Sequence, residues 1–167
     1  MDKVALLVAV IAIIATFLAA KSSSVRNESH QQVNNIHALL KEISDITHRY
    51  FEGYVVTAQD TLDIDKRRAN TYEAVCNMKL DLLESSLTLL VRRCTSYFFY
   101  DANSAEFLES YIDKIGAMRD KISEKAYLET FPHSSIFSID SSLTRLYADL
   151  NQYIGDRFRP VFEKATD

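Results

Sequence analysis

The sequence is poor in the residues that make turns. Of its 167 residues only 3 are glycine and 2 are proline, whereas the two together average about 12% of a protein. β-Sandwiches and barrels need a turn every 8–12 residues or so, and nucleotide-binding α/β folds need glycine loops. Low-complexity chains rich in proline and glycine are excluded as well. With 47% hydrophobic and 25% charged residues, we expect a globular, helical protein.

The common catalytic and metal-binding motifs are also missing. The chain has no G-x-S-x-G, P-loop, H-E-x-x-H or C-x-x-C motif. Asp45 and His48 stand one helical turn apart, as in half of a di-iron site, but the pair occurs once and lies off the apolar seam. We expect a solvated surface pair there, and a protein with no metal, no cofactor and no enzymatic activity. A net charge of −4 argues against nucleic acid as a partner.

The N-terminus carries the only long uncharged apolar run. It covers residues 4–20, follows Lys3 and is interrupted only by Thr16. A basic start, an apolar centre and small residues at the end predict a signal peptide over residues 1–20, cleaved after Ala20. An uncleaved membrane anchor is the alternative, because 17 residues are about the lower limit for crossing a bilayer.

A short polar lead-in, residues 21–29, follows the apolar run. It contains the sequon Asn27-Glu28-Ser29, which predicts glycosylation of Asn27 in a secreted chain. The remaining residues, 30–167, form the predicted helical-bundle domain.

Four long segments of this domain have helical periodicity. They cover about 30–57, 60 or 61 to 100, 103–131, and 138 or 140 to about 160. Apolar residues recur in each at spacings of three and four, the pattern of a coiled-coil seam. These segments predict an all-α fold, an elongated antiparallel four-helix bundle. The seam residues are Val33, Ile36, Leu40, Ile43, Thr47, Tyr50 and Tyr54; Ala69, Tyr72, Cys76, Leu80, Leu83, Leu87, Leu90, Cys94 and Tyr97; Leu108, Tyr111, Ile115, Met118, Ile122 and Ala126; and Leu143, Leu146, Leu150, Tyr153, Arg157 and Val161.

Whether the two cysteines can form a disulfide depends on whether the second segment is one continuous helix. On one helix Cys76 and Cys94 share a face but stand about 27 Å apart, and a disulfide needs Cα atoms within about 7 Å. A break near Ser85 would create a fifth helix and allow the bond. The seam runs through Ser85 without slipping, which favours a continuous helix with two buried thiols; the disulfide remains the alternative.

Consecutive aromatic residues are the strongest candidates for binding. Tyr97, Phe98, Phe99 and Tyr100 point in every direction around a helix, so they cannot all face one core. They either cap an end of the bundle or contact a partner. The helical positions of Gly116 and Gly155 suggest a close approach of neighbouring helices.

These features favour a secreted, non-enzymatic bundle that binds another protein in the extracellular space. The alternative is a carrier of a lipid or another hydrophobic small molecule inside the bundle. If the N-terminal segment is uncleaved, the same bundle is tethered to a membrane and lies outside the cytoplasm.

Overall fold

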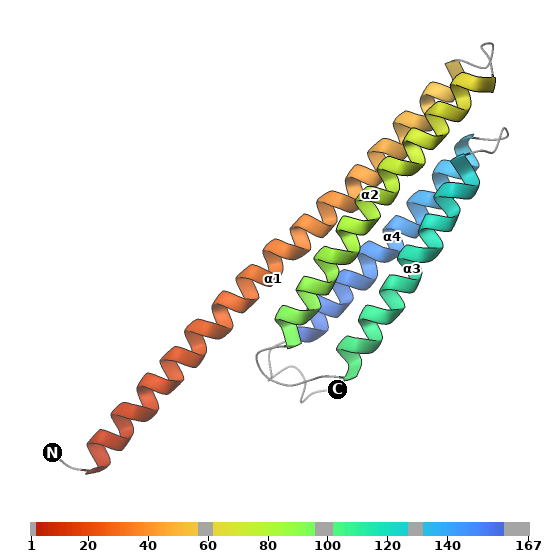
Figure 1. Ribbon diagram of the computed structural model, residues 1–167. Helices are drawn as coiled ribbons and strands as arrows, with labels where there is room; N and C mark the ends of the chain where they lie inside the picture. The colour runs from red at the N-terminus through yellow and green to blue at the C-terminus, as the bar shows by residue number, and fades with distance from the viewer. Residues whose placement is uncertain (1–2, 57–61, 96–101, 127–131, 159–167) are drawn as a thin grey trace.

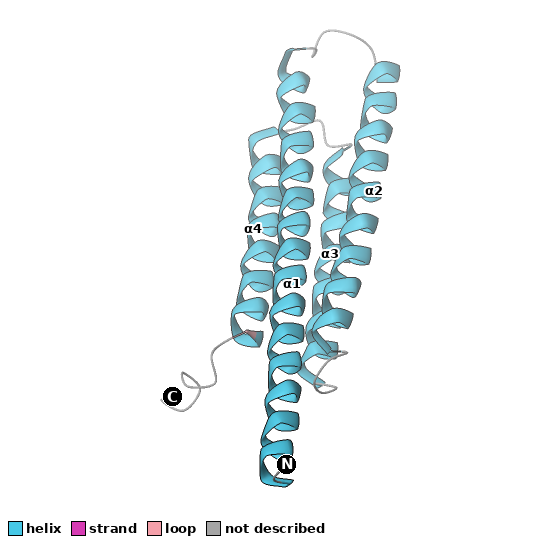
Figure 2. Ribbon diagram, turned by 90° about the vertical axis from the view of Figure 1, so that its left-hand side faces the viewer, coloured by secondary structure: helices cyan, strands magenta, loops and turns pink. Residues whose placement is uncertain are grey.

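The protein is an all-α four-helix bundle. We describe residues 3–56, 62–95, 102–126 and 132–158 of a computed structural model. Helices α1 (Lys3–Val56), α2 (Leu62–Thr95), α3 (Ala102–Ala126) and α4 (Pro132–Arg157) account for nearly all of these residues, and no strand occurs among them. The helices run alternately up and down, and each packs against two neighbours in the cyclic order α1, α2, α3, α4 (Figures 1 and 2).

The predicted seams form the core. The described seam residues of α1 and α2 are all buried, and those of α3 are buried except Leu108, which is partly buried. In α4 the buried line runs through Ile139, Leu143, Leu146, Leu150 and Ile154, with Tyr153 partly buried beside it. A seam spacing of three and four residues therefore holds the four helices together within the bundle, which on α1 starts at Ser29.

Helix α1 is much longer than predicted. It is one continuous helix of 54 residues, and the lead-in at residues 21–29 is part of it. Ser29 is fully buried, with its Oγ 3.7 Å from the Cys94 Sγ of α2. The bundle thus already begins inside the stretch for which a polar lead-in was expected.

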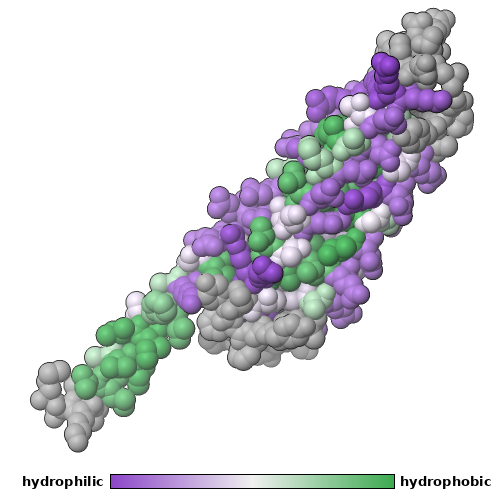
Figure 3. All heavy atoms as spheres, viewed as in Figure 1, coloured by the Kyte–Doolittle hydropathy of each residue, from purple (hydrophilic) through white to green (hydrophobic). Residues whose placement is uncertain are grey.

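The apolar start of α1 projects from the bundle. Figure 3 shows it as a mostly apolar rod beyond the mixed surface of the four helices. Every residue from 6 to 20 is exposed, and the segment is long and apolar enough to cross a membrane. Its length and composition suit either a signal peptide or a membrane anchor.

Helix α4 begins earlier than its predicted caps. Ser138 and Asp140 were expected to start it, but the helix starts at Pro132. Proline suits the first helical position, where its missing N–H costs nothing. Ser138 instead accepts a hydrogen bond at its carbonyl from the Ser142 hydroxyl, and Asp140 bonds across to α1.

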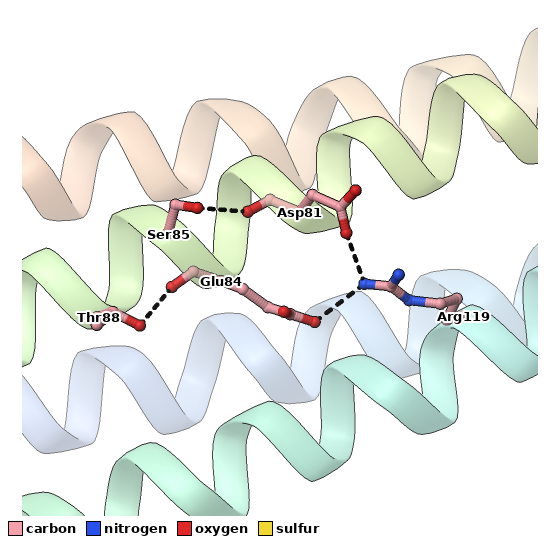
Figure 4. Close-up of polar contacts among 5 residues, drawn as sticks. All are labelled: Asp81, Glu84, Ser85, Thr88 and Arg119. Atoms are coloured by element: carbon pink, nitrogen blue, oxygen red, sulfur yellow. Dashed lines mark hydrogen bonds and ion pairs between the residues drawn. The ribbon is translucent and has the colours of Figure 1, made fainter.

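Helix α2 is continuous through Ser85, as the uninterrupted seam predicted. The Ser85 hydroxyl donates to the Asp81 carbonyl, and the Thr88 hydroxyl donates to the Glu84 carbonyl (Figure 4). These polar side chains therefore bond back to their own helix without breaking it.

An arginine of α3 joins α3 to α2 at the same level. The guanidinium of Arg119 lies 2.9 Å from an Asp81 oxygen and 3.0 Å from a Glu84 oxygen (Figure 4). The three side chains are partly exposed, so the bridge contributes little free energy. Its charges do favour the observed pairing of α3 with α2.

Contrary to expectation, the glycines of α3 and α4 do not lie where neighbouring helices approach closely. A Cβ atom added to Gly116 or Gly155 would meet nothing within 4 Å. Close helix approach is therefore the wrong explanation for these glycines, since both face open space.

Candidate functional site

The described helices hold only part of the predicted site residues. The aromatic run Tyr97, Phe98, Phe99 and Tyr100 lies outside the described residues. Asn27 is exposed on α1, just beyond the apolar segment. Its side chain is accessible from solvent, which a glycan requires.

The two cysteines lie on one face of α2, and both are free and buried. Burial raises the pKa of Cys76 to about 12, although a hydrogen bond with Tyr72 works against the shift. Burial also raises the pKa of Cys94, against the opposing effects of Ser29 and Arg157. The thiolate is the nucleophilic form of cysteine, so both groups are poor nucleophiles in the folded protein.

The hydroxyl groups of the core tyrosines form hydrogen bonds within the bundle. The Thr47 hydroxyl donates to the Ile43 carbonyl at 2.8 Å, so Tyr72 donates to the Thr47 oxygen, 3.0 Å away. The Tyr72 ring stacks on Tyr50 with 4.2 Å between centroids, and the Tyr50 hydroxyl donates to the Ala126 carbonyl at 2.7 Å. Two tyrosines thus form a polar layer that joins α1, α2 and α3.

A second tyrosine layer lies between α3 and α4. Tyr111 is buried, and its hydroxyl donates to the Leu146 carbonyl at 2.9 Å. Tyr153 stacks on Phe107 at 4.0 Å between centroids and shares a hydrogen bond with Ser104. The core tyrosines therefore satisfy their hydroxyls within the protein and need no bound ligand to do so.

Asp140 of α4 joins two side chains of α1. One of its oxygens lies 2.7 Å from the Ser44 Oγ, and the other lies 2.8 Å from the His48 Nε2. In a Ser-His-Asp catalytic triad the histidine lies between the serine and the carboxylate, but here the carboxylate is in the middle. The group is therefore suited to clamp α1 to α4, and Asp45 is not the partner of His48.

His37 lines an open groove between α1 and α4. Its ring stacks on Tyr147 at 4.0 Å between centroids, and its Nε2 is buried without a hydrogen-bond partner in the described part of the chain. Burial lowers the pKa of His37 below the usual 6.5. Lys41 and Asp140 also line the groove. Metal-binding groups of three or more acidic, histidine or cysteine side chains are absent from the described residues.

The outer surface of α2 has a second, exposed apolar line. Met78, Leu82 and Leu89 are 52%, 47% and 47% exposed, and all three lie on one helical face. We call this surface the outer α2 face, with the members Thr71, Val75, Met78, Leu82, Ser85 and Leu89. Their spacings of four and three residues repeat the heptad rule of the core seam. Sequence analysis missed this second heptad line because it assigned one seam to each helix.

An apolar residue of α1, Ile46, borders the outer α2 face. Leu39 and Ile46 are partly buried and pack against the core, and Ile46 and Val75 line one shallow groove together. Figure 3 shows apolar residues in a broken line along the bundle on the side toward the viewer. The ion pair between Lys79 and Glu42, at 2.5 Å, joins α2 to α1 beside this groove.

Both ends of the outer α2 face are basic. Arg67 and Arg49 line the groove at one end, and Arg92 and Arg93 lie in the last turn of α2 at the other. Only Arg93 of these four has a described carboxylate partner, Glu28, and the 4.0 Å separation is long. The face is therefore an apolar strip between two positively charged ends.

No known protein family, curated protein or solved structure matches this chain.

Proposed function

We propose that the protein is a non-enzymatic helical bundle that binds another protein in the extracellular space. In this proposal the N-terminal apolar segment directs the bundle across a membrane, as a cleaved signal or as an anchor that holds it at the cell surface.

One observation supports this function most strongly. The seam residues fill the inside of the bundle, whereas three large apolar side chains remain exposed on a single face of α2. Apolar residues aligned on one face favour contact with another protein more than scattered ones do.

A carrier of a lipid or another hydrophobic molecule is the alternative function. Such a carrier needs apolar space between its helices. The core tyrosines instead find hydrogen-bond partners inside the bundle, and the groove between α3 and α4 is crossed by the Lys114–Asp149 ion pair. These features favour the protein-binding function.

Site-specific photo-crosslinking on eukaryotic cells would test the proposal. A photoreactive amino acid is placed in the full chain at Leu82 on α2, Ile112 on α3 or Tyr147 on α4, all of which are exposed. We expect a discrete protein adduct from at least one position, larger than the chain alone. The proposal is wrong if none of the three positions yields a protein adduct, or if the adducts contain lipid only.

A further inference from the structure

We infer that the outer α2 face binds an amphipathic helix of a partner protein, with acidic residues at both ends of that helix. This inference rests on the proposed protein-binding function and names the surface and the chemistry of the partner.

The periodicity of the face indicates a helical partner. Its members follow one another at four, three, four, three and four residues from Thr71 to Leu89. Within the bundle the same spacing is the one that packs helix against helix. A partner helix with apolar residues at heptad positions would therefore fit this line in the same way as the bundle's own helices fit each other.

The length of the face sets the length of the partner helix. Thr71 and Leu89 are 18 residues apart on one continuous helix, which corresponds to about 27 Å. Five turns of partner helix would cover that distance. Ile46 of α1 lines one groove together with Thr71 and Val75 of the face, so the partner would contact α1 as well as α2.

The positive charges at the two ends of the face favour a partner helix with negatively charged residues. Arg49 and Arg67 at one end and Arg92 at the other have no ion-pair partner among the described side chains. Glutamate or aspartate beyond the apolar positions of the partner would meet these arginines. Such pairs at the edge of an interface add specificity and speed association.

The same charges argue against a second copy of this chain as the occupant. Two copies packed in parallel through this face would bring Arg67 against Arg67. Antiparallel packing would bring Arg67 against Arg92. Like charges would meet in both orientations, which opposes self-association.

Two synthetic helices of about 25 residues, about 37 Å long, provide the test. They share one apolar heptad line and differ only in having glutamates or lysines at both ends. The full chain is held in nanodiscs of zwitterionic lipid, and fluorescence anisotropy reports the binding of labelled peptide. Empty nanodiscs measure how much peptide the lipid takes up.

We expect the glutamate-ended helix to bind, and Leu82→Glu to weaken that binding by at least about tenfold because it puts a charge into the contact. Ile112→Glu is the matched control, since Ile112 is an exposed apolar residue (37%) on α3; it should leave binding unchanged. Reversing both Arg67 and Arg92 to glutamate should switch the preference to the lysine-ended helix. Circular dichroism checks that each variant is folded.

The inference is overturned if neither helix binds, if both bind the unmodified chain equally, or if Leu82→Glu and Ile112→Glu behave alike. Self-association of the chain that Leu82→Glu abolishes would also overturn it. None of these results removes the proposed function, because a protein adduct at Ile112 or Tyr147 in the crosslinking experiment would still support it through another face.

Discussion

Two buried tyrosine hydroxyls should differ in their contribution to stability, although each donates a hydrogen bond to a backbone carbonyl over a similar distance. Tyr50 donates to the carbonyl of Ala126, the last residue of α3. A carbonyl in the last helical turn has no N–H partner within its own helix. Tyr111 donates to the carbonyl of Leu146, which lies inside α4, where carbonyls also accept a backbone N–H four residues later.

The Phe variants remove the same atom from both sites. Tyr50→Phe leaves a buried carbonyl at a helix end, which costs about 2 kcal/mol. Tyr111→Phe leaves a carbonyl that keeps its helical bond, so the loss is about 1 kcal/mol. Tyr147→Phe is the control, because Tyr147 is exposed and its hydroxyl is free to bond to water.

Urea unfolding of the full chain in mild detergent, followed by far-UV circular dichroism, measures the three free energies. We expect Tyr50→Phe to lower the free energy of unfolding most, Tyr111→Phe less, and Tyr147→Phe hardly at all. Equal losses at Tyr50 and Tyr111, or the reverse order, would refute the argument from unsatisfied helix-end carbonyls.

Three further predictions concern other parts of the bundle. Gly116→Ala and Gly155→Ala should each raise the free energy of unfolding by up to about 1 kcal/mol, since a Cβ finds open space at both positions; a loss measured by the same urea assay would contradict this. Leu87→Ala should cost about 2–5 kcal/mol because Leu87 is fully buried, whereas Leu89→Ala on the exposed line should cost far less; equal losses would contradict the assignment of the two lines. The folded chain resists protonating His37 because its pKa is lowered, whereas the unfolded chain takes up that proton near pH 6.5, so stability should fall as the pH drops below about 6.5. His37→Gln should flatten this fall in urea titrations between pH 5 and 7, and an unchanged pH dependence would contradict it.

The sequence predicted the core well because the core is periodic. Spacings of three and four residues depend only on the helical repeat, so the seam residues from Val33 to Tyr50 and from Ala69 to Cys94 were found without knowledge of their partners. The same periodicity correctly predicted that α2 continues past Ser85.

Features that depend on contacts between helices were not predictable in this way. Ser29 belongs to the bundle because it lies against Cys94, 65 residues away. Asp140 resembled a helix cap but bonds to Ser44 and His48 of α1. Local sequence cannot show such partners, and it led to the wrong start of α4.

The outer α2 face was missed for a different reason. Its heptad line from Thr71 to Leu89 is present in the sequence, but Ser85 and Thr71 weaken it, and the stronger line through Leu80, Leu83 and Leu87 conceals it. In the structure, the exposure of Met78, Leu82 and Leu89 separates the second line from the core. A search for two heptad lines on one helix would have found it.

The central claim is that the core of the bundle is closed to solvent and to ligands, so that a partner binds on the outer surface. Thiol labelling tests most directly whether the core is closed. Cys76 and Cys94 are buried in the core, and the raised pKa of both thiols further slows their reaction with iodoacetamide. We predict that intact mass spectrometry finds no label on the native full chain after hours of exposure, and two labels per chain once denaturant is added. Rapid labelling of Cys76 in the native chain would show that the bundle opens, and a denatured chain that takes no label without reductant would show a disulfide; either result would contradict the account.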